Sequence, residues 1–321
     1  MTFPASKIKV AVLGTGSIGM RHLATLKKMK RVEAIAIPKR EERLAALKQD
    51  GWVVVPNLKS AHELGVTCCI IATDTNRHIE DGILALELGM DILVEKPMAS
   101  NAKAANVLWQ KAKEKNLKIF VGCNLRFSES LTTFRELLPQ IGPVHSVCIE
   151  CQSYLPDWRP DRPYRESYSA RSGEGGVLLD LIHEIDYAGW IFGWPTVLHS
   201  ELKNLGRLNI ETEEMAHLFW KTSAGAAVTI SLDYLTRIPR RKMRAHGAKG
   251  NIKWDGIANS VLLELAGEQT KVFPFSQTRD QMMQNQLQAF LNCRLKNGSG
   301  PLATAKEGIL ALTICDTARK Q

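Results

Sequence analysis

The sequence predicts an α/β protein in which an N-terminal doubly wound parallel sheet precedes an α+β domain with a large, mostly antiparallel open sheet. Residues 7–121 alternate short apolar runs with helical stretches, and this alternation is typical of β–α–β units. Beyond Gly142-Pro143 the chain changes to strand-like runs joined by turns that contain glycine. With 321 residues, 45% hydrophobic and 23% charged, the chain has the length and composition of a globular protein of two domains.

The first element is the apolar run Lys7–Leu13, which reads as a buried parallel strand and leads through a glycine turn into a helix. In the spacing Gly14-x-Gly16-x-x-Gly19 the first glycine allows a tight bend and the second lets a pyrophosphate approach the backbone. The third lets helix and strand pack closely, and free N–H groups at the helix start would face the phosphates. A flexible turn is the alternative. The strand before it and the helix after it favour dinucleotide binding, through Gly14, Gly16, Ser17, Ile18 and Gly19.

The second strand, Val32–Ile37, ends where the preference for NAD(H) or NADP(H) is usually determined. A protein that prefers NAD has an acidic residue there, about twenty residues past the glycines, to bind the ribose 2′-hydroxyl. This chain has Pro38, Lys39 and Arg40 instead. Two cations, with no carboxylate expected to repel a 2′-phosphate, favour NADP(H). NAD(H) is the alternative, with both side chains simply solvated.

Three further strands are expected at residues 52–55, 66–72 and 90–94, with a polar helix near 57–64 and another helix that ends at Leu88. Ligands of parallel sheets bind beyond the carboxyl ends of the strands. Two segments follow strands at that edge, and the cofactor contacts expected from them are Thr73, Asp74, Asn76, His78, Glu95 and Lys96.

Lys96 directly follows a buried strand in the tripeptide Glu95-Lys96-Pro97. A lysine in this place can donate a hydrogen bond to a substrate oxygen, and desolvation can lower its pKa into a catalytic range. Pro97 restricts Lys96 to an extended backbone. A lone tripeptide means little, because most surface lysines are solvated. The position at the rim of the sheet makes Lys96 a candidate catalytic and substrate-binding residue.

A helix at 101–115 and a strand at 118–121 complete the first domain, so the expected domains are residues 1–122 and 123–321. The crossing segment 124–127 is expected to reach the cofactor through Asn124 and Arg126, and a helix to Leu138 follows. Strands of the second domain are expected at 144–155, 197–205, 215–221, 226–234, 242–245, 251–254 and 260–265, and final helices at 279–296 and 303–319.

Residues 175–192 read as one helix that is apolar nearly all round and therefore buried. Its polar residues are three or four apart and would share one face. For an isolated histidine a structural role is the usual one. A carboxylate and an imidazole together on a buried face cost desolvation that function commonly explains. The polar residues of this face are Asp180, His183, Glu184 and Tyr187.

Just before this helix, residues 154–171 form a long loop interrupted by prolines, with aromatic rings and four arginines that three acids partly offset. Loops of this length in compact domains often bind ligands. The alternative is that the arginines are solvated or make a subunit contact. The substrate contacts expected from this loop are Trp158, Arg159, Tyr164, Arg165 and Tyr168.

Composition excludes several classes of protein. The net charge of +9 includes a basic stretch at 236–253, but no nucleic-acid-binding motif accompanies it, so a solvated sheet face is the better interpretation. No stretch approaches the roughly 18 apolar residues of a membrane span, and residues 1–7 have no apolar leader region. Seven cysteines lie mostly among apolar neighbours, as expected of reduced thiols in the cytoplasm, and no metal is expected.

Together these motifs resemble the Gfo/Idh/MocA family of nicotinamide-dependent sugar oxidoreductases over almost the full chain. The resemblance implies an N-terminal Rossmann domain and a C-terminal domain whose sheet often mediates oligomerisation, so that a homo-dimer or tetramer is expected. It also implies a catalytic lysine that acts with an aspartate and a histidine, which correspond to Lys96, Asp180 and His183. Many members place three residues between that aspartate and histidine, whereas this chain has two, so Asp180 and His183 cannot both lie where the longer spacing places them.

From this resemblance we expect hydride transfer between nicotinamide and a sugar hydroxyl or carbonyl. His183 would accept the hydroxyl proton, Lys96 would hydrogen-bond the same oxygen, and Asp180 would orient His183. The arginines and aromatic rings of residues 154–171 suggest an anionic sugar, carboxylated or linked to a nucleotide, as does the likeness of residues 175–192 to family members of bacterial surface-polysaccharide metabolism. The alternative is a dinucleotide-binding sensor that keeps the fold without turnover.

Overall fold

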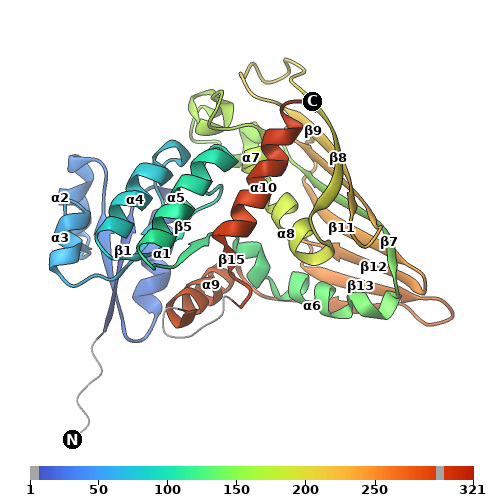
Figure 1. Ribbon diagram of the computed structural model, residues 1–321, viewed down its shortest axis with the longest axis horizontal. Coiled ribbons are helices and arrows are strands. Elements are labelled where there is room, and N and C mark those ends of the chain that lie inside the picture. Colours follow the sequence, from blue (N-terminus) through green and yellow to red (C-terminus); the bar gives the residue numbers. More distant parts are fainter. Residues whose placement is uncertain (1–6, 294–299) are drawn as a thin grey trace, which may run out of the picture. The chain divides into compact units, whose positions relative to one another are not determined.

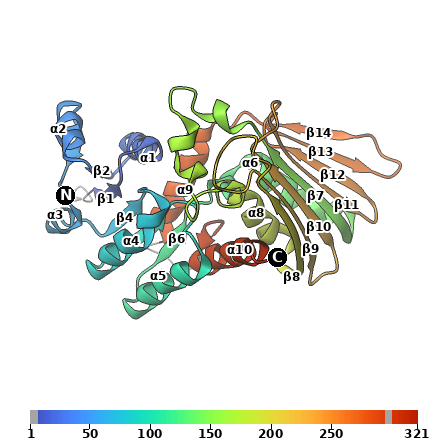
Figure 2. The same ribbon diagram turned by 90° about the horizontal axis from the view of Figure 1, so that it is seen from above.

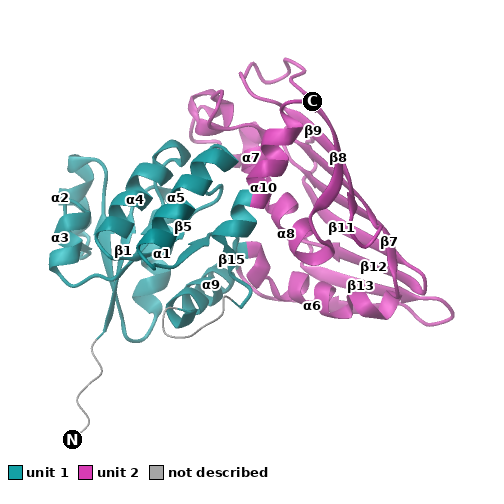
Figure 3. Ribbon diagram, viewed as in Figure 1, with its two compact units in different colours: residues 1–124, 279–309 teal, residues 125–278, 310–321 magenta. Residues whose placement is uncertain are grey.

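The computed structural model describes residues 7–293 and 300–321, and its chain divides into two compact units (Figures 1 and 3). Unit 1 comprises residues 1–124 and 279–309, and unit 2 comprises residues 125–278 and 310–321. The division differs from a single boundary after residue 122, because residues 279–309 return to unit 1. The expected helix 279–296 is observed as α9 (Arg279–Cys293), and its last three residues lie outside the described residues.

Unit 1 is built on sheet A, which has seven strands among the described residues, in the order β15-β6-β5-β4-β1-β2-β3. All neighbours pair in parallel except β15 and β6. This confirms the predicted doubly wound parallel sheet, with the order reversing on either side of β1. The bounds are β1 (Ile8–Leu13), β2 (Val32–Ile37), β3 (Val53–Val54), β4 (Cys68–Ile71), β5 (Asp91–Val94), β6 (Ile119–Val121) and β15 (Ala303–Thr304).

Helices cover both faces of sheet A, which explains why its central strands are apolar throughout. In Figure 2, α1 and α9 lie on one face and α4 and α5 on the other. Asparagine caps begin two helices, because Asn57 accepts a hydrogen bond from the Ser60 N–H and Asn101 from the Ala104 N–H. The other helices of this unit are α1 (Ser17–Lys28), α2 (Glu41–Gln49), α3 (Leu58–Glu63), α4 (His78–Glu87) and α5 (Ala102–Glu114).

Unit 2 is built on sheet B, which has eight strands among the described residues, in the order β14-β13-β12-β11-β7-β10-β9-β8. Only the β7–β10 pair is parallel within the described sheet. Burial alternates along β9 and β10, as expected of a sheet with one face on the core. The bounds are β7 (Val144–Gln152), β8 (Pro195–Lys203), β9 (Met215–Thr222), β10 (Ala227–Asp233), β11 (Arg240–Gly247), β12 (Gly250–Asp255), β13 (Ser260–Leu265) and β14 (Lys271–Pro274).

The predicted single helix at 175–192 is wrong. It is two helices, α7 (Val177–Asp180) and α8 (Ile182–Phe192), and Leu181 between them has φ −99° and ψ 27°. Tyr234, directly after β10, binds Asp180 of the first helix, and Arg241 of β11 binds Glu184 of the second. Asp180 therefore lies on a different helix from His183, Glu184 and Tyr187.

The long loop 154–171 folds into three short 3₁₀ turns at Leu155–Trp158, Tyr164–Glu166 and Tyr168–Ala170. The remaining helices are α6 (Glu129–Leu137), which packs on β12 and β13, and α10 (Ala305–Ala318). Within the described ranges, we find no helix with the length and apolar character needed to cross a bilayer.

Candidate active site

The glycine turn between β1 and α1 has the geometry that dinucleotide binding needs. Gly14 has φ +95°, which a residue with a side chain rarely adopts, and Gly19 packs against the Gly14 carbonyl, where a Cβ would clash. A Cβ on Gly16 would meet no heavy atom within 4 Å, so open space lies over the backbone of Gly16. Gly16 is also the N-cap of α1 and supplies no side chain to its first amides. Ser17 and Ile18 begin this helix, whose free amides and dipole favour an anion.

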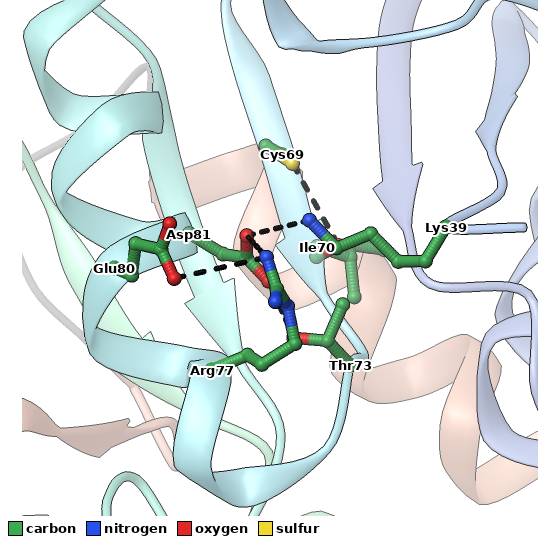
Figure 4. Close-up of polar contacts among 7 residues, drawn as sticks. All are labelled: Lys39, Cys69, Ile70, Thr73, Arg77, Glu80 and Asp81. Carbon is green, nitrogen blue, oxygen red and sulfur yellow. Dashed lines mark hydrogen bonds and ion pairs between the residues drawn. The ribbon is translucent and has the colours of Figure 1, made fainter.

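Lys39 and Arg40 are both exposed just after β2, where the sequence placed them. The expectation that no carboxylate lies near them is wrong, because Lys39 Nζ donates to Oδ1 of Asp81 over 2.8 Å (Figure 4). Asp81 lies on α4, 42 residues further along the chain, and its side chain is 4% exposed. Thr73 Oγ1 donates to Oδ2 of the same carboxylate over 2.9 Å, and Arg77 approaches it to 3.5 Å.

The Lys96 segment is held by two buried groups of unit 1. Oε1 of Glu95 lies 2.6 Å from Nε2 of His22 on α1, and Oε2 accepts the backbone N–H of Lys96 over 3.3 Å. Gly122 packs on the carboxyl group of Glu95, where a Cβ would come within about 3.0 Å. The Glu95 side chain is therefore occupied by contacts within unit 1, and one of these contacts helps to fix the backbone of Lys96.

His78 is buried and joins the two loops that follow β4 and β5. Its Nδ1 lies 2.9 Å from the Pro97 carbonyl oxygen and its Nε2 lies 3.0 Å from the Thr73 carbonyl oxygen. Burial lowers the pKa of His78 below its ordinary value. A neutral imidazole donates from one nitrogen only, so one of the two contacts is then not a hydrogen bond. The other residues expected to reach a cofactor from this loop, Asp74 and Asn76, are exposed.

In unit 2, Asp180 is anchored by Tyr234, which directly follows β10. The Tyr234 hydroxyl donates to Oδ2 of Asp180 over 2.6 Å, and both side chains are buried. Burial and the nearby Asp180 carboxylate raise the pKa of both Tyr234 and Tyr168. His183, half-buried in the first turn of α8, is three positions along the chain from Asp180. Tyr234 was missed because only its place at the end of a strand-like run marks it in the sequence.

The loop 154–171 brings aromatic rings and arginines to the same part of unit 2. The Trp158 ring meets the Tyr234 ring edge-on at 5.4 Å, and the Arg159 guanidinium lies 5.9 Å from the Tyr168 ring. Tyr164 and Arg165 are engaged differently, because both donate to the Leu208 carbonyl oxygen, over 3.1 and 3.2 Å. These contacts fasten the loop to the segment before β9.

Asn124 is half-buried at the end of unit 1, while Arg126 belongs to unit 2 and is 1% exposed. The Arg126 guanidinium pairs with Asp186 of α8 through two hydrogen bonds, Nε to Oδ2 at 2.9 Å and NH2 to Oδ1 at 2.7 Å. This bidentate arrangement is the strongest geometry for such a pair. Contact between Arg126 and a cofactor stays a prediction.

Glu184 and Tyr187, the other two polar residues expected on the buried helix face, meet sheet B. Glu184 pairs with Arg241 of β11 over 2.8 Å, and the Tyr187 hydroxyl lies 3.5 Å from the same carboxylate. Among residues 7–293 and 300–321 no group of three or more His, Cys, Asp or Glu side chains could hold a metal ion.

A doubly wound sheet with a glycine turn between β1 and α1 defines the class of Rossmann-fold dinucleotide-binding proteins. The profile described as "Oxidoreductase family, NAD-binding Rossmann fold" matches residues 8–123, and the Gfo/Idh/MocA C-terminal domain matches residues 135–253. The chain belongs to the Gfo/Idh/MocA family of NAD(P)-dependent sugar oxidoreductases, which confirms the resemblance.

Curated relatives have low identity to the chain. An uncharacterized oxidoreductase of Streptococcus pneumoniae is 27% identical over 270 residues, which are 82% of this chain and 72% of the relative. The scyllo-inositol 2-dehydrogenase (NADP(+)) IolW of Bacillus subtilis is 25% identical over 224 residues, 66% of this chain and 59% of its own. The chain thus spans less than two thirds of the second relative.

Solved structures share the fold over nearly the whole chain. The UDP-N-acetylglucosamine 3-dehydrogenase GnnA of Acidithiobacillus ferrooxidans has a TM-score of 0.81 and 17% identity, and the match covers 98% of this chain and 97% of that one. Levoglucosan dehydrogenase in complex with NADH and levoglucosan has a TM-score of 0.85 and 18% identity, with 98% of each chain covered. At such identities the likeness shows the fold alone.

Proposed function

We propose that this protein transfers a hydride between nicotinamide and the hydroxyl or carbonyl carbon of a sugar. The main support is Lys96, directly after a buried strand of sheet A, with its backbone held by Glu95 and Glu95 held by His22. A lysine whose backbone is fixed at the ligand-binding edge of a sheet suits a positioned hydrogen-bond donor. A sensor with the same fold has no need for the lysine, and turnover with any sugar would separate the two functions.

The proposed chemistry assigns each site residue one task. The nicotinamide, when bound, accepts the hydride that leaves the sugar C–H bond. His183 accepts the proton of the hydroxyl, and Lys96 donates a hydrogen bond to the oxygen as it becomes a carbonyl. The carboxylate of Asp180, fixed by Tyr234, orients His183 and stabilises its charged form. The reduction direction reverses these roles.

We expect an anionic sugar to be the better substrate, because Trp158 and Arg159 are exposed on the loop 154–171. Aromatic rings can cover a sugar face, and a guanidinium binds carboxylate or phosphate. The relatives include enzymes named for a nucleotide sugar and for a neutral polyol. The measurement is kcat/KM for a uronic acid or nucleotide sugar against inositol or glucose, at low and high salt.

Arg159→Met should reduce kcat/KM for the anionic sugar selectively, and the loss should shrink in high salt. Arg135→Met removes the same charge from α6 and serves as the control. A neutral sugar that is turned over better than the anionic one, with no salt dependence and no effect of Arg159→Met, would show that the arginines of this loop do not recognise the substrate.

The preferred cofactor is expected to be NADP(H), because Lys39 and Arg40 follow β2 where a 2′-phosphate is usually bound. Replacing both with glutamine should erase the preference while the protein still binds NAD(H). Titration of the protein with NADPH and NADH separately, followed by nicotinamide fluorescence, measures both affinities. Equal affinities in the unmodified protein would refute the expected preference for NADP(H).

We also propose that the protein assembles into a dimer or tetramer through the outer face of sheet B. Val197 and Phe219 support this, because they are 45% and 42% exposed on neighbouring strands β8 and β9. Light scattering on the purified protein measures the number of subunits. A cytoplasmic location stays a prediction.

A further inference from the structure

Asp81 is a buried carboxylate that collects hydrogen-bond donors from separate segments of unit 1. Lys39 follows β2, Thr73 follows β4, and Arg77 lies in the turn before α4, and all three side chains contact the Asp81 carboxylate (Figure 4). The Asp81 side chain is 4% exposed, whereas those of Lys39 and Arg77 are 36% and 42% exposed. The carboxylate is thus fixed, and the two cations that it binds still reach solvent.

The location of this cluster connects it with the dinucleotide. Strands β2 and β4 flank β1 in sheet A, so the residues that follow them lie on either side of the glycine turn. Lys39 reaches from one of these strand ends to a carboxylate that Thr73 binds from the other. In doubly wound folds the adenosine ribose binds at this edge, next to the end of β2. The acid that is missing after β2 is therefore present nearby, supplied by α4.

We propose that Asp81 determines the dinucleotide preference by competing with the 2′-phosphate for Lys39. A 2′-phosphate must draw Lys39 away from a fixed negative charge and then lie close to that charge. NADH carries no such phosphate and leaves the Lys39–Asp81 pair intact. Asp81 therefore restrains the NADP(H) preference that Lys39 provides. This inference rests on the proposed dinucleotide binding and adds a specificity-determining residue that lies outside the β2 end.

The test is binding of NADPH and NADH to the full-length protein without any sugar. Asp81→Asn removes the charge but keeps one oxygen that can accept from Lys39, while its new NH2 group can donate to the Thr73 hydroxyl. It should tighten NADPH binding about tenfold while NADH binding changes little, the size of one charge interaction near a surface. The gain should disappear in the Asp81→Asn, Lys39→Met double variant, because it acts through Lys39. It should also shrink with added salt.

Glu87→Gln is the matched control, because it removes the same charge from the exposed far end of α4 and should leave the NADPH to NADH ratio unchanged. Lys39→Met alone changes a partly exposed side chain and should weaken NADPH, which keeps the proposal testable if Asp81→Asn folds poorly. An unchanged ratio in Asp81→Asn, or NADPH binding that is indifferent to Lys39→Met, overturns the inference.

Two further outcomes are distinct. Asp81→Asn could instead weaken NADH binding and leave NADPH binding unchanged, both in the otherwise unmodified protein and in the Lys39→Met variant. Asp81 would then bind the ribose hydroxyl directly, and the proposed competition for Lys39 would be wrong. If neither dinucleotide binds to the unmodified protein, the proposed function itself fails. If both dinucleotides bind and Asp81→Asn does not change the ratio of their affinities, only this inference is refuted and the proposed function stands.

Discussion

Lys96→Ala is expected to lower kcat by about 10²- to 10⁴-fold on the true substrate, the range for loss of a group that assists proton transfer. Affinity for the cofactor should stay within a few-fold, since the glycine turn and the helix start that face the phosphates are unchanged. Steady-state kinetics with the best sugar, together with cofactor titration, measure both quantities. Lys103→Ala, an exposed lysine in the first turn of α5, is the control.

The companion variant His183→Ala should have a similar effect on kcat. The double variant should lose less than the product of the two single losses, because the proposed mechanism makes the two groups act as a unit. Near-normal kcat in Lys96→Ala would show that Lys96 is not a catalytic residue. Strictly multiplicative losses would mean that Lys96 and His183 act in separate steps.

Local sequence patterns were sufficient to predict the parallel strands of sheet A and the glycine turn. The reason is that each feature depends on residues close together in the sequence. Glycine spacing predicts the turn with Gly14 at positive φ, and a continuous apolar run predicts a strand buried on both faces. Seven strands of sheet B were predicted for the same reason, by alternation within each run, whereas β14 (Lys271–Pro274) was missed. The two-residue strand β15 was missed, because it depends on pairing with β6 from far along the chain.

The side-chain partners that shape the candidate site could not be read from the sequence. Lys39 and Asp81 are hydrogen-bonded although they lie 42 residues apart in the sequence, and Tyr234 and Asp180 are hydrogen-bonded 54 residues apart. Such pairs leave no periodic signal, since nothing in either local segment identifies the partner. The break at Leu181 was missed because neither glycine nor proline marks it within residues 177–188.

The ion pair between Arg126 and Asp186 should have the largest effect on the stability of unit 2. Both side chains are almost fully buried, at 1% and 3% exposed. Arg126→Met removes one partner and leaves a buried carboxylate without its counter-charge, which typically costs about 3–5 kcal/mol in the free energy of unfolding. Urea unfolding followed by tryptophan fluorescence measures the loss, and Trp190 lies near the pair, 5.3 Å from the guanidinium.

Arg135→Met is the matched control for this experiment. Arg135 lies over the same Trp190 ring at 4.3 Å, but its side chain is exposed and forms no ion pair with a carboxylate among the described residues. The control should therefore cost less than about 1 kcal/mol, as exposed charged groups do. The double variant Arg126→Met, Asp186→Leu should recover much of the lost stability, because it removes the stranded charge as well. Equal losses in Arg126→Met and Arg135→Met would assign the effect to packing on Trp190 and not to the ion pair.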